Sequence, residues 1–422
     1  MKVVAHTLLA PSLCLLLAGC ASFSPDLSAD AAFLERAQTL ERAGLTVSVA
    51  VPTRKEAKRY FGTDVGSDGV QPVWLRVVNS TPHAQLFLPM SMDPDYHSPA
   101  EVAWKAHLLM RGGSNRAMDE HFSRLEFPTT VQGGETASGF IYTNATLGVK
   151  YLGVDLRSDV AAHRFDFMVE IPGSQLDYQQ VDFDNLYAAD EIRDVDEAGL
   201  RAALEALPCC VLGGDKETPG DPANIVVIAP PDGLAQPFLR RGWHVTETIR
   251  TGTVFGTVAS SVFGRSYKNS PISSLYMFGR PQDVALQKAR DTVDERNHLR
   301  LWLAPLLYDG KDVWVGQISR DIGVRMSSRT FVTHKIDPDV DAARFYLVQD
   351  LANSGGMSGL AYVKGVGVAS RANPRFNYTR DGYFTDGLRA VHILGFDHVN
   401  IEEIEVLDWE DPADFDELSE AE

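Results

Sequence analysis

The chain has 422 residues, 44% of them hydrophobic, and a formal net charge of -18. This length exceeds what one hydrophobic core usually serves, so it predicts two domains. The negative charge argues against nucleic acid as a partner, because phosphate binding requires clustered Lys and Arg. Residues 396–422 hold twelve Asp or Glu and no Lys or Arg, so this acidic tail supplies -12 of the -18. We expect the tail to be extended and solvated, or to dock onto a basic partner or divalent cations.

The N-terminal segment has the layout of a secretory signal. Lys2 precedes an apolar stretch at residues 8–17, which ends in Leu17-Ala18-Gly19-Cys20. This ending resembles the lipobox of bacterial lipoproteins, which implies a signal peptide at residues 1–19 and a lipid on Cys20. Ala21 after the cysteine implies a periplasm-facing protein at the outer membrane of a Gram-negative bacterium. The alternative is an uncleaved transmembrane anchor, but the apolar stretch falls short of the ~20 residues that span a bilayer.

The next segments change from a helical to a strand period. Residues 20–44 are expected to form a tether and a short helix at 30–43, because apolar side chains recur there at helical spacing. Residues 45–175 alternate between apolar and polar side chains in short runs, which predicts a β-sandwich-like all-β domain. Its expected strands are 45–51, 73–78, 85–88, 136–142, 150–156 and 165–171, with a helix inserted at 100–109.

Residues 176–220 are predicted to form an acidic linker with a short helix at 194–207. Eight of the side chains in residues 177–197 are acidic and one, Arg193, is basic. Cys209 and Cys210 follow directly after this helix. Because unpaired cysteines are often buried, we favour two small apolar residues on a buried strand over a disulfide between these neighbours.

Strands and helices are interleaved in residues 221–395, which predicts an α/β or α+β domain. Asp309-Gly310 is expected to close a hairpin, and Asp337 to cap a helix that has Pro338 at its first position. The expected strands are 224–229, 298–305, 312–318 and 389–394, and the expected helices are 232–241, 251–263 and 337–353.

Polar side chains of this second domain are the candidates for chemistry. His298 and His334 could act as acid/base groups or metal ligands, with Asp321 and Asp341 as their carboxylate partners. Arg300 shares one face of an alternating strand with His298. The candidate anion- or substrate-binding side chains are Arg280, Arg300 and Trp302.

Each candidate also has a structural interpretation. Asp341 and its neighbours suit the start of a helix, because carboxylates favour the positive end of the helix dipole. The polar face of the strand at 298–302 could simply face solvent. Asp386-Gly387 is typical of a tight turn.

Five segments of the second domain stand out together, at residues 220–227, 275–285, 298–302, 334–341 and 383–387. In this order they resemble the LssY C-terminal domain family. In that family the domain often follows membrane modules of the DedA or lipid-phosphate-phosphatase type, whereas here we expect a lipid anchor and a β-rich domain to precede it. The resemblance implies envelope- or lipid-related work without defining a reaction.

The sequence therefore predicts a membrane-anchored binding or scaffold module for an envelope protein, a glycan or a lipid head group. The alternative is a hydrolase of phosphorylated or lipid-linked substrates. Convergence of His298, His334 and a carboxylate within about 3 to 5 Å would favour the hydrolase. The sequence defines neither a cofactor nor a metal.

Overall fold

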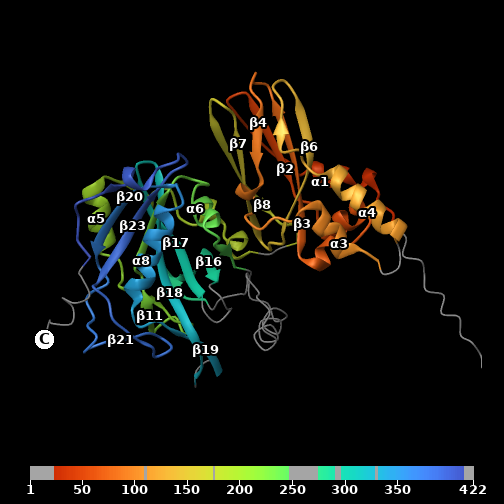
Figure 1. Ribbon diagram of the computed structural model, residues 1–422. Helices are drawn as coiled ribbons and strands as arrows, with labels where there is room; N and C mark the ends of the chain where they lie inside the picture. Colours follow the sequence, from red (N-terminus) through yellow and green to blue (C-terminus); the bar gives the residue numbers. More distant parts are fainter. Residues whose placement is uncertain are drawn as a thin grey trace, which may run out of the picture.

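The computed structural model describes residues 23–108, 112–173, 176–246, 274–289, 296–327 and 331–412. The chain is mostly β, with several sheets (Figure 1). The expected signal peptide, Cys20, the expected helix at 251–263 and the end of the acidic tail lie outside the described residues. Among the helices of these ranges, none has the length and apolar character needed to cross a membrane.

Two four-stranded antiparallel sheets form the core of the first domain, with the orders β1-β2-β3-β6 and β5-β4-β7-β8. Alternate side chains from both sheets, such as Val47, Leu75, Leu152 and Phe167, meet in one buried cluster. The strands are β1 (Gln38–Arg42), β2 (Leu45–Ala50), β3 (Val70–Asn79), β4 (Gln85–Leu88), β5 (Thr130–Val131), β6 (Thr136–Asn144), β7 (Val149–Arg157) and β8 (Ala162–Glu170).

The expected helix at 30–43 is mostly wrong. Only η1 (Leu27–Asp30) and α1 (Ala31–Leu34) are helical, and β1 follows as an edge strand paired with β2. Ala43 and Gly44 both have positive φ, 52° and 78°. Two such residues form the tight turn that matches the twist of a hairpin, so the chain reverses there instead of continuing as a helix.

Three helices cover one end of the first domain, in addition to its strands. They are α2 (Arg54–Phe61), α3 (Pro99–Ala106) and α4 (Gly112–Leu125), and only α3 was expected. Thr53 and Glu56 form a capping box at α2, which is the sequence signal that could have located this helix. In Figure 1, α3 and α4 lie at the end of the first domain away from the second domain.

A ten-stranded mixed sheet organises the second domain. Its main order is β13-β16-β17-β18-β12-β23-β20-β24, with β19 on β18 and β9 on β17. The strands are β9 (Arg193–Val195), β12 (Ile225–Ala229), β13 (His244–Val245), β16 (Val284–Ala289), β17 (Arg296–Tyr308), β18 (Lys311–Ser327), β19 (Phe331–Ile336), β20 (Met357–Lys364), β23 (Leu388–Leu394) and β24 (Glu405–Val406).

Helices cover both faces of this sheet. Phe238 of α6 (Ala235–Arg240) and Leu347 of α8 (Val340–Ala352) share a buried cluster with Val227. Leu204 of α5 (Glu197–Glu205) packs in a second cluster with Val226, the next residue of the same strand. Because successive side chains of a strand point to opposite faces, α6 and α8 lie on one face and α5 on the other.

The Asp309-Gly310 turn lies where the sequence predicts it, whereas the N-cap of α8 does not. Asp309 and Gly310 both have positive φ, 51° and 66°, and close the β17–β18 hairpin as expected. The N-cap of α8 is Asp339, whose side chain accepts a hydrogen bond from Ala342 N, so the expected cap at Asp337 is wrong by two residues. Asp337 instead accepts from Asp339 N and shapes the turn before the helix.

The segment expected to be a linker packs against the second domain. β9 pairs with β17, and α5 lies on the sheet. Beyond α5, β10 (Cys210–Leu212) and β11 (Pro219–Pro222) join β14 (Tyr276–Met277) and β15 (Arg280–Pro281) in a four-stranded sheet. Acidic side chains on the exposed surface of this segment are compatible with such packing, because the apolar side chains of α5 face inward.

Candidate functional site

A buried polar cluster forms around His298 on β17. His298 Nε2 lies 2.6 Å from Asp321 Oδ2 on the neighbouring strand β18. Arg300 Nη1 donates a hydrogen bond to Gln317 Oε1 at 2.9 Å, one step further along the same two strands. Strand alternation places His298 and Arg300 on one face, and the β17–β18 register brings Gln317 and Asp321 beside them.

A carboxylate of β11, Asp221, completes this cluster. Asp221 accepts hydrogen bonds from Asn377 Nδ2 at 2.7 Å and from Gln317 Nε2 at 3.3 Å. Asp221 and Asn377 lie 156 residues apart in the sequence, so no local pattern could have joined them. We refer to His298, Arg300, Gln317, Asp321, Asp221 and Asn377 as the polar cluster.

Burial dominates the electrostatics of the polar cluster. It lowers the pKa of His298, and the neighbouring Asp321 only partly reverses this effect. Burial likewise raises the pKa of Asp221 against the effect of its bond from Asn377, and it lowers the pKa of Arg300. His298 is therefore neutral at pH 7, and it hydrogen-bonds a carboxylate, as a general base does.

The backbone of β19 places His334 on the β18–β19 hairpin. On β19 it pairs with Val324, whereas Asp321 pairs with Ile336. His334 therefore lies on the hairpin beyond the polar cluster. Its side chain lies outside the described residues, so the structure does not test the convergence with His298 that would favour a hydrolase.

Asp341 belongs to a different cluster. Its carboxylate accepts hydrogen bonds from Thr385 Oγ1 at 2.8 Å and from Asp386 N at 2.6 Å. Arg344 lies 3.4 Å from Asp341 and bonds both carboxylate oxygens of Asp386 at 2.7 and 2.6 Å. Burial raises the pKa of Asp341 to about 6, and the charge of Arg344 counteracts this rise.

The Asp341 cluster joins the first turn of α8 to the turn at Asp386-Gly387. Gly387 has φ 87°, which agrees with the tight turn expected there. Arg344, the central member, was not singled out from the sequence. Its position three residues after Asp341 on a helix was the signal that could have found it.

Arg280 and Trp302 lie in a third place. Arg280 donates to both oxygens of Asp283, at 2.9 and 2.8 Å, and to the Tyr187 hydroxyl. Trp302 is fully buried in the core that α5 covers, and its indole donates to the Arg280 carbonyl at 3.3 Å. Both side chains therefore bond to groups within the protein, and none of these groups belongs to the polar cluster.

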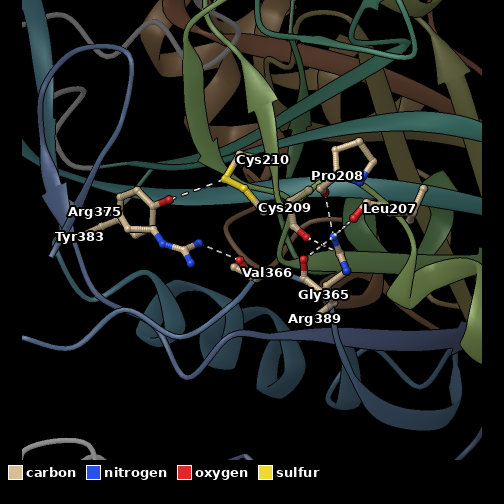
Figure 2. Close-up of a disulfide and its surroundings, with 10 residues drawn as sticks. Leu207, Pro208, Cys209, Cys210, Gly365, Val366, Arg375, Tyr383 and Arg389 are labelled. Atoms are coloured by element: carbon tan, nitrogen blue, oxygen red, sulfur yellow. Dashed lines mark hydrogen bonds between the residues drawn. A yellow bond between two sulfur atoms is a disulfide. The ribbon is translucent and has the colours of Figure 1, made fainter. Parts of the chain in front are cut away.

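The favoured interpretation of the two cysteines is wrong, because Cys209 and Cys210 form a disulfide with each other (Figure 2). Cys210 Sγ lies 3.6 Å from the Tyr383 hydroxyl. The fully buried Arg389 donates to the carbonyls of Leu207 and Pro208 and so fixes the chain that leads into the disulfide. Small size and low polarity suit both a paired and an unpaired cysteine, so the sequence could not distinguish them.

A charged network joins the two domains. Arg240 at the end of α6 bonds Asp166 of β8 at 2.8 Å and the Tyr151 hydroxyl of β7 at 3.2 Å. Arg164 Nε lies 3.1 Å from the other carboxylate oxygen of Asp166. The side chains of Arg240 and Asp166 are 13% and 15% exposed, so water screens this bond only weakly.

Two clefts flank this joint, and Arg164 and Arg240 line both of them. The smaller one has a volume of about 450 Å³ and includes Arg42 and His398. The larger one has a volume of about 820 Å³. Its walls come from the loop after η3 (Pro89–Ser91), from β7 and from the α6–β13 connection.

One carboxylate in the larger cleft is short of partners. Among the described residues, no group donates a hydrogen bond to the Asp155 carboxylate, and its nearest cation is Arg164 Nε at 3.6 Å. Burial raises the pKa of Asp155, and the charge of Arg164 works against this rise. The Asp155 side chain is 30% exposed and lines the cleft, although its Oδ1 atom, which faces Arg164, is itself buried.

No metal centre is evident in the described parts of the chain, where no three His, Cys, Asp or Glu side chains form a group that could hold an ion.

Residues 207–388 match the family described as LssY C-terminus, so the chain carries an LssY-like C-terminal domain. The match includes the disulfide, the polar cluster and the Asp341 cluster. It starts at the end of α5, earlier than the resemblance found in the sequence. No curated protein matches the chain.

Proposed function

We propose that this protein is a lipid-anchored module of the bacterial envelope that binds a glycan in the larger cleft between its two domains. The observation that carries the proposal is the cleft of about 820 Å³ with charged side chains from both domains on its walls. A volume of this size is within the range of small-ligand sites. The lipobox-like Leu17-Ala18-Gly19-Cys20 supports the anchor and the periplasm-facing location at the outer membrane.

The balance of donors and acceptors favours a sugar over a charged head group. Arg164 and Arg240 offer hydrogen-bond donors, and Asp155 offers an acceptor that lacks a donor. A sugar hydroxyl can both donate and accept, so it suits a cleft wall on which a carboxylate and two guanidinium groups lie close together. A phosphate bound by the same guanidinium groups would lie beside the Asp155 carboxylate, and the two negative charges would repel each other.

The experiment is cosedimentation with purified cell-wall sacculi. Because its carboxylate accepts no hydrogen bond, Asp155→Ala is expected to leave the fold intact while reducing the bound fraction about tenfold, as expected for ~1.4 kcal/mol of lost binding. Asp159→Ala is the matched control, since its side chain is 75% exposed in the same domain. Wild-type protein that stays in the supernatant would refute the proposal.

One observation favours a second candidate function, hydrolysis of a phosphorylated or lipid-linked substrate. His298 and Asp321 form a buried acid/base pair at 2.6 Å with Arg300 nearby. The test is phosphate release from phosphatidic acid in detergent, with His298→Gln as the variant. Equal release by the two proteins, or none by either, would remove this candidate.

A further inference from the structure

The described chain begins beside one helix of the first domain. Phe23 packs edge-on against His121 of α4, with 5.5 Å between the ring centroids. Cys20 precedes Phe23 by three residues, which span at most about 11 Å when fully extended. A lipid on Cys20 would therefore hold α4 within roughly that distance of the bilayer surface.

An exposed tryptophan lies next to the same helix. Trp104 of α3 is 74% exposed, the largest exposed fraction among the large hydrophobic side chains of the described residues. Its ring contacts His107, and His107 Nε2 lies 2.8 Å from Asp119 of α4. Phe23 and Trp104 thus flank α4, whose diameter is about 10 to 12 Å.

The charge of this end differs from that of the whole chain. Residues 99–125 contain four basic and three acidic side chains, a net of +1, whereas the chain carries -18. The seven are Lys105, Arg111, Arg116, Arg124, Glu101, Asp119 and Glu120. An anionic bilayer repels the acidic remainder of the protein but does not repel this end, because its net charge is slightly positive.

We infer that the α3–α4 end of the first domain is a membrane-docking face, with Trp104 inserted at the level of the lipid head groups. The inference rests on the proposed lipid anchor, which brings this end to the surface. Tryptophan suits the place because its ring is apolar and its indole N–H can bond to the head groups. In Figure 1, α3 and α4 lie far from the ten-stranded sheet, so docking in this way holds the second domain away from the bilayer.

Fluorescence quenching by lipids tests the docking face. The native full-length product is incorporated into vesicles of phosphatidylethanolamine and phosphatidylglycerol that carry bromine near the head groups. The difference between wild type and Trp104→Phe isolates the emission of Trp104 from that of the five other tryptophans. We expect that emission to fall at least about twofold, as for an interfacial tryptophan. Unchanged emission on vesicle-bound protein would overturn the inference.

Two controls separate the docking face from the lipid anchor. Mass spectrometry of the N-terminal peptide reports acylation of Cys20 independently. A Cys20→Ser chain from residue 20 onward, held on nickel-chelating vesicles by an N-terminal hexahistidine tag, reports docking without acylation. Quenching in this chain with no acylation of the native protein would refute the anchor and support the docking face. In a Trp104→Phe background, a tryptophan introduced by Val406→Trp on β24 is the matched probe expected to stay unquenched, since Val406 is 67% exposed in the second domain.

Discussion

Replacing Asp321 by alanine is expected to destabilise the second domain strongly, because the carboxylate lies within the buried polar cluster. It bonds His298 at 2.6 Å, and a hydrogen bond to a charged group is worth about 1.5 to 3 kcal/mol. It also supplies negative charge near the buried Arg300. Removing one partner from a buried charged set costs about 3 to 5 kcal/mol. Asp221 remains close to Arg300, so we expect a loss of about 3 kcal/mol.

Urea unfolding followed by tryptophan fluorescence measures this loss, since Trp302 and Trp314 lie on the same two strands as the polar cluster. With a urea dependence of about 2 to 3 kcal/mol/M, the unfolding midpoint should fall by roughly 1 M. Asp408→Ala, at an exposed position, is the control and should shift the midpoint little. A loss below about 1 kcal/mol for Asp321→Ala would refute the reasoning, because a buried partner cannot be removed so cheaply.

Three further predictions concern the Asp341 cluster and the disulfide. The raised pKa of Asp341, about 6 against 3.8 unfolded, gives stability that is fully present below pH 3.8 and is lost as the pH rises through 6. Between pH 4 and pH 7 wild type should therefore lose about 2.5 kcal/mol relative to Asp341→Asn in urea unfolding. Arg344→Met should cost about 3 to 5 kcal/mol in the same assay at pH 7, because Asp341 and Asp386 are left without their cation. Cys209→Ala with Cys210→Ala should cost only about 1 kcal/mol by the same measurement, since the disulfide closes a loop of two residues.

Distinct outcomes would contradict each of these predictions. Parallel stability curves for wild type and Asp341→Asn across pH 4 to 7 would mean that the carboxyl group is not perturbed. A near-neutral Arg344→Met would show that the cluster carries little stability. A loss above about 3 kcal/mol for the double cysteine variant would show that the disulfide does more than restrict the unfolded chain.

Local sequence patterns predicted those strands and turns whose conformation depends mainly on the residues within them. The alternation around Val47 and Leu75 located β2 and β3, and Asp309-Gly310 located the β17–β18 turn. The helix expected at 30–43 failed because the turn at Ala43-Gly44 outweighed a weak helical period. Pairing with β2 decides between helix and strand for residues 38–42. This pairing cannot be read from the local pattern of apolar residues.

The candidate site was predicted only in part for the same reason. Alternation put His298 and Arg300 on one face, and the hairpin register then made Asp321 a partner of His298. Asp341 went to a separate cluster because the packing of α8 fixes the position of its first turn. The contact between Asp166 and Arg240 bridges 74 residues and two domains, and no motif marks it.

Hydrogen–deuterium exchange with soluble disaccharide fragments of the cell wall tests the central claim most directly. Binding in the larger cleft predicts slower exchange in its walls, at residues 89–95, 149–157 and 239–244. The same account predicts unchanged exchange around the polar cluster, at residues 296–300 and 317–321. Protection confined to the polar cluster, with none in the cleft walls, would contradict glycan binding between the domains and would favour a site at His298 instead.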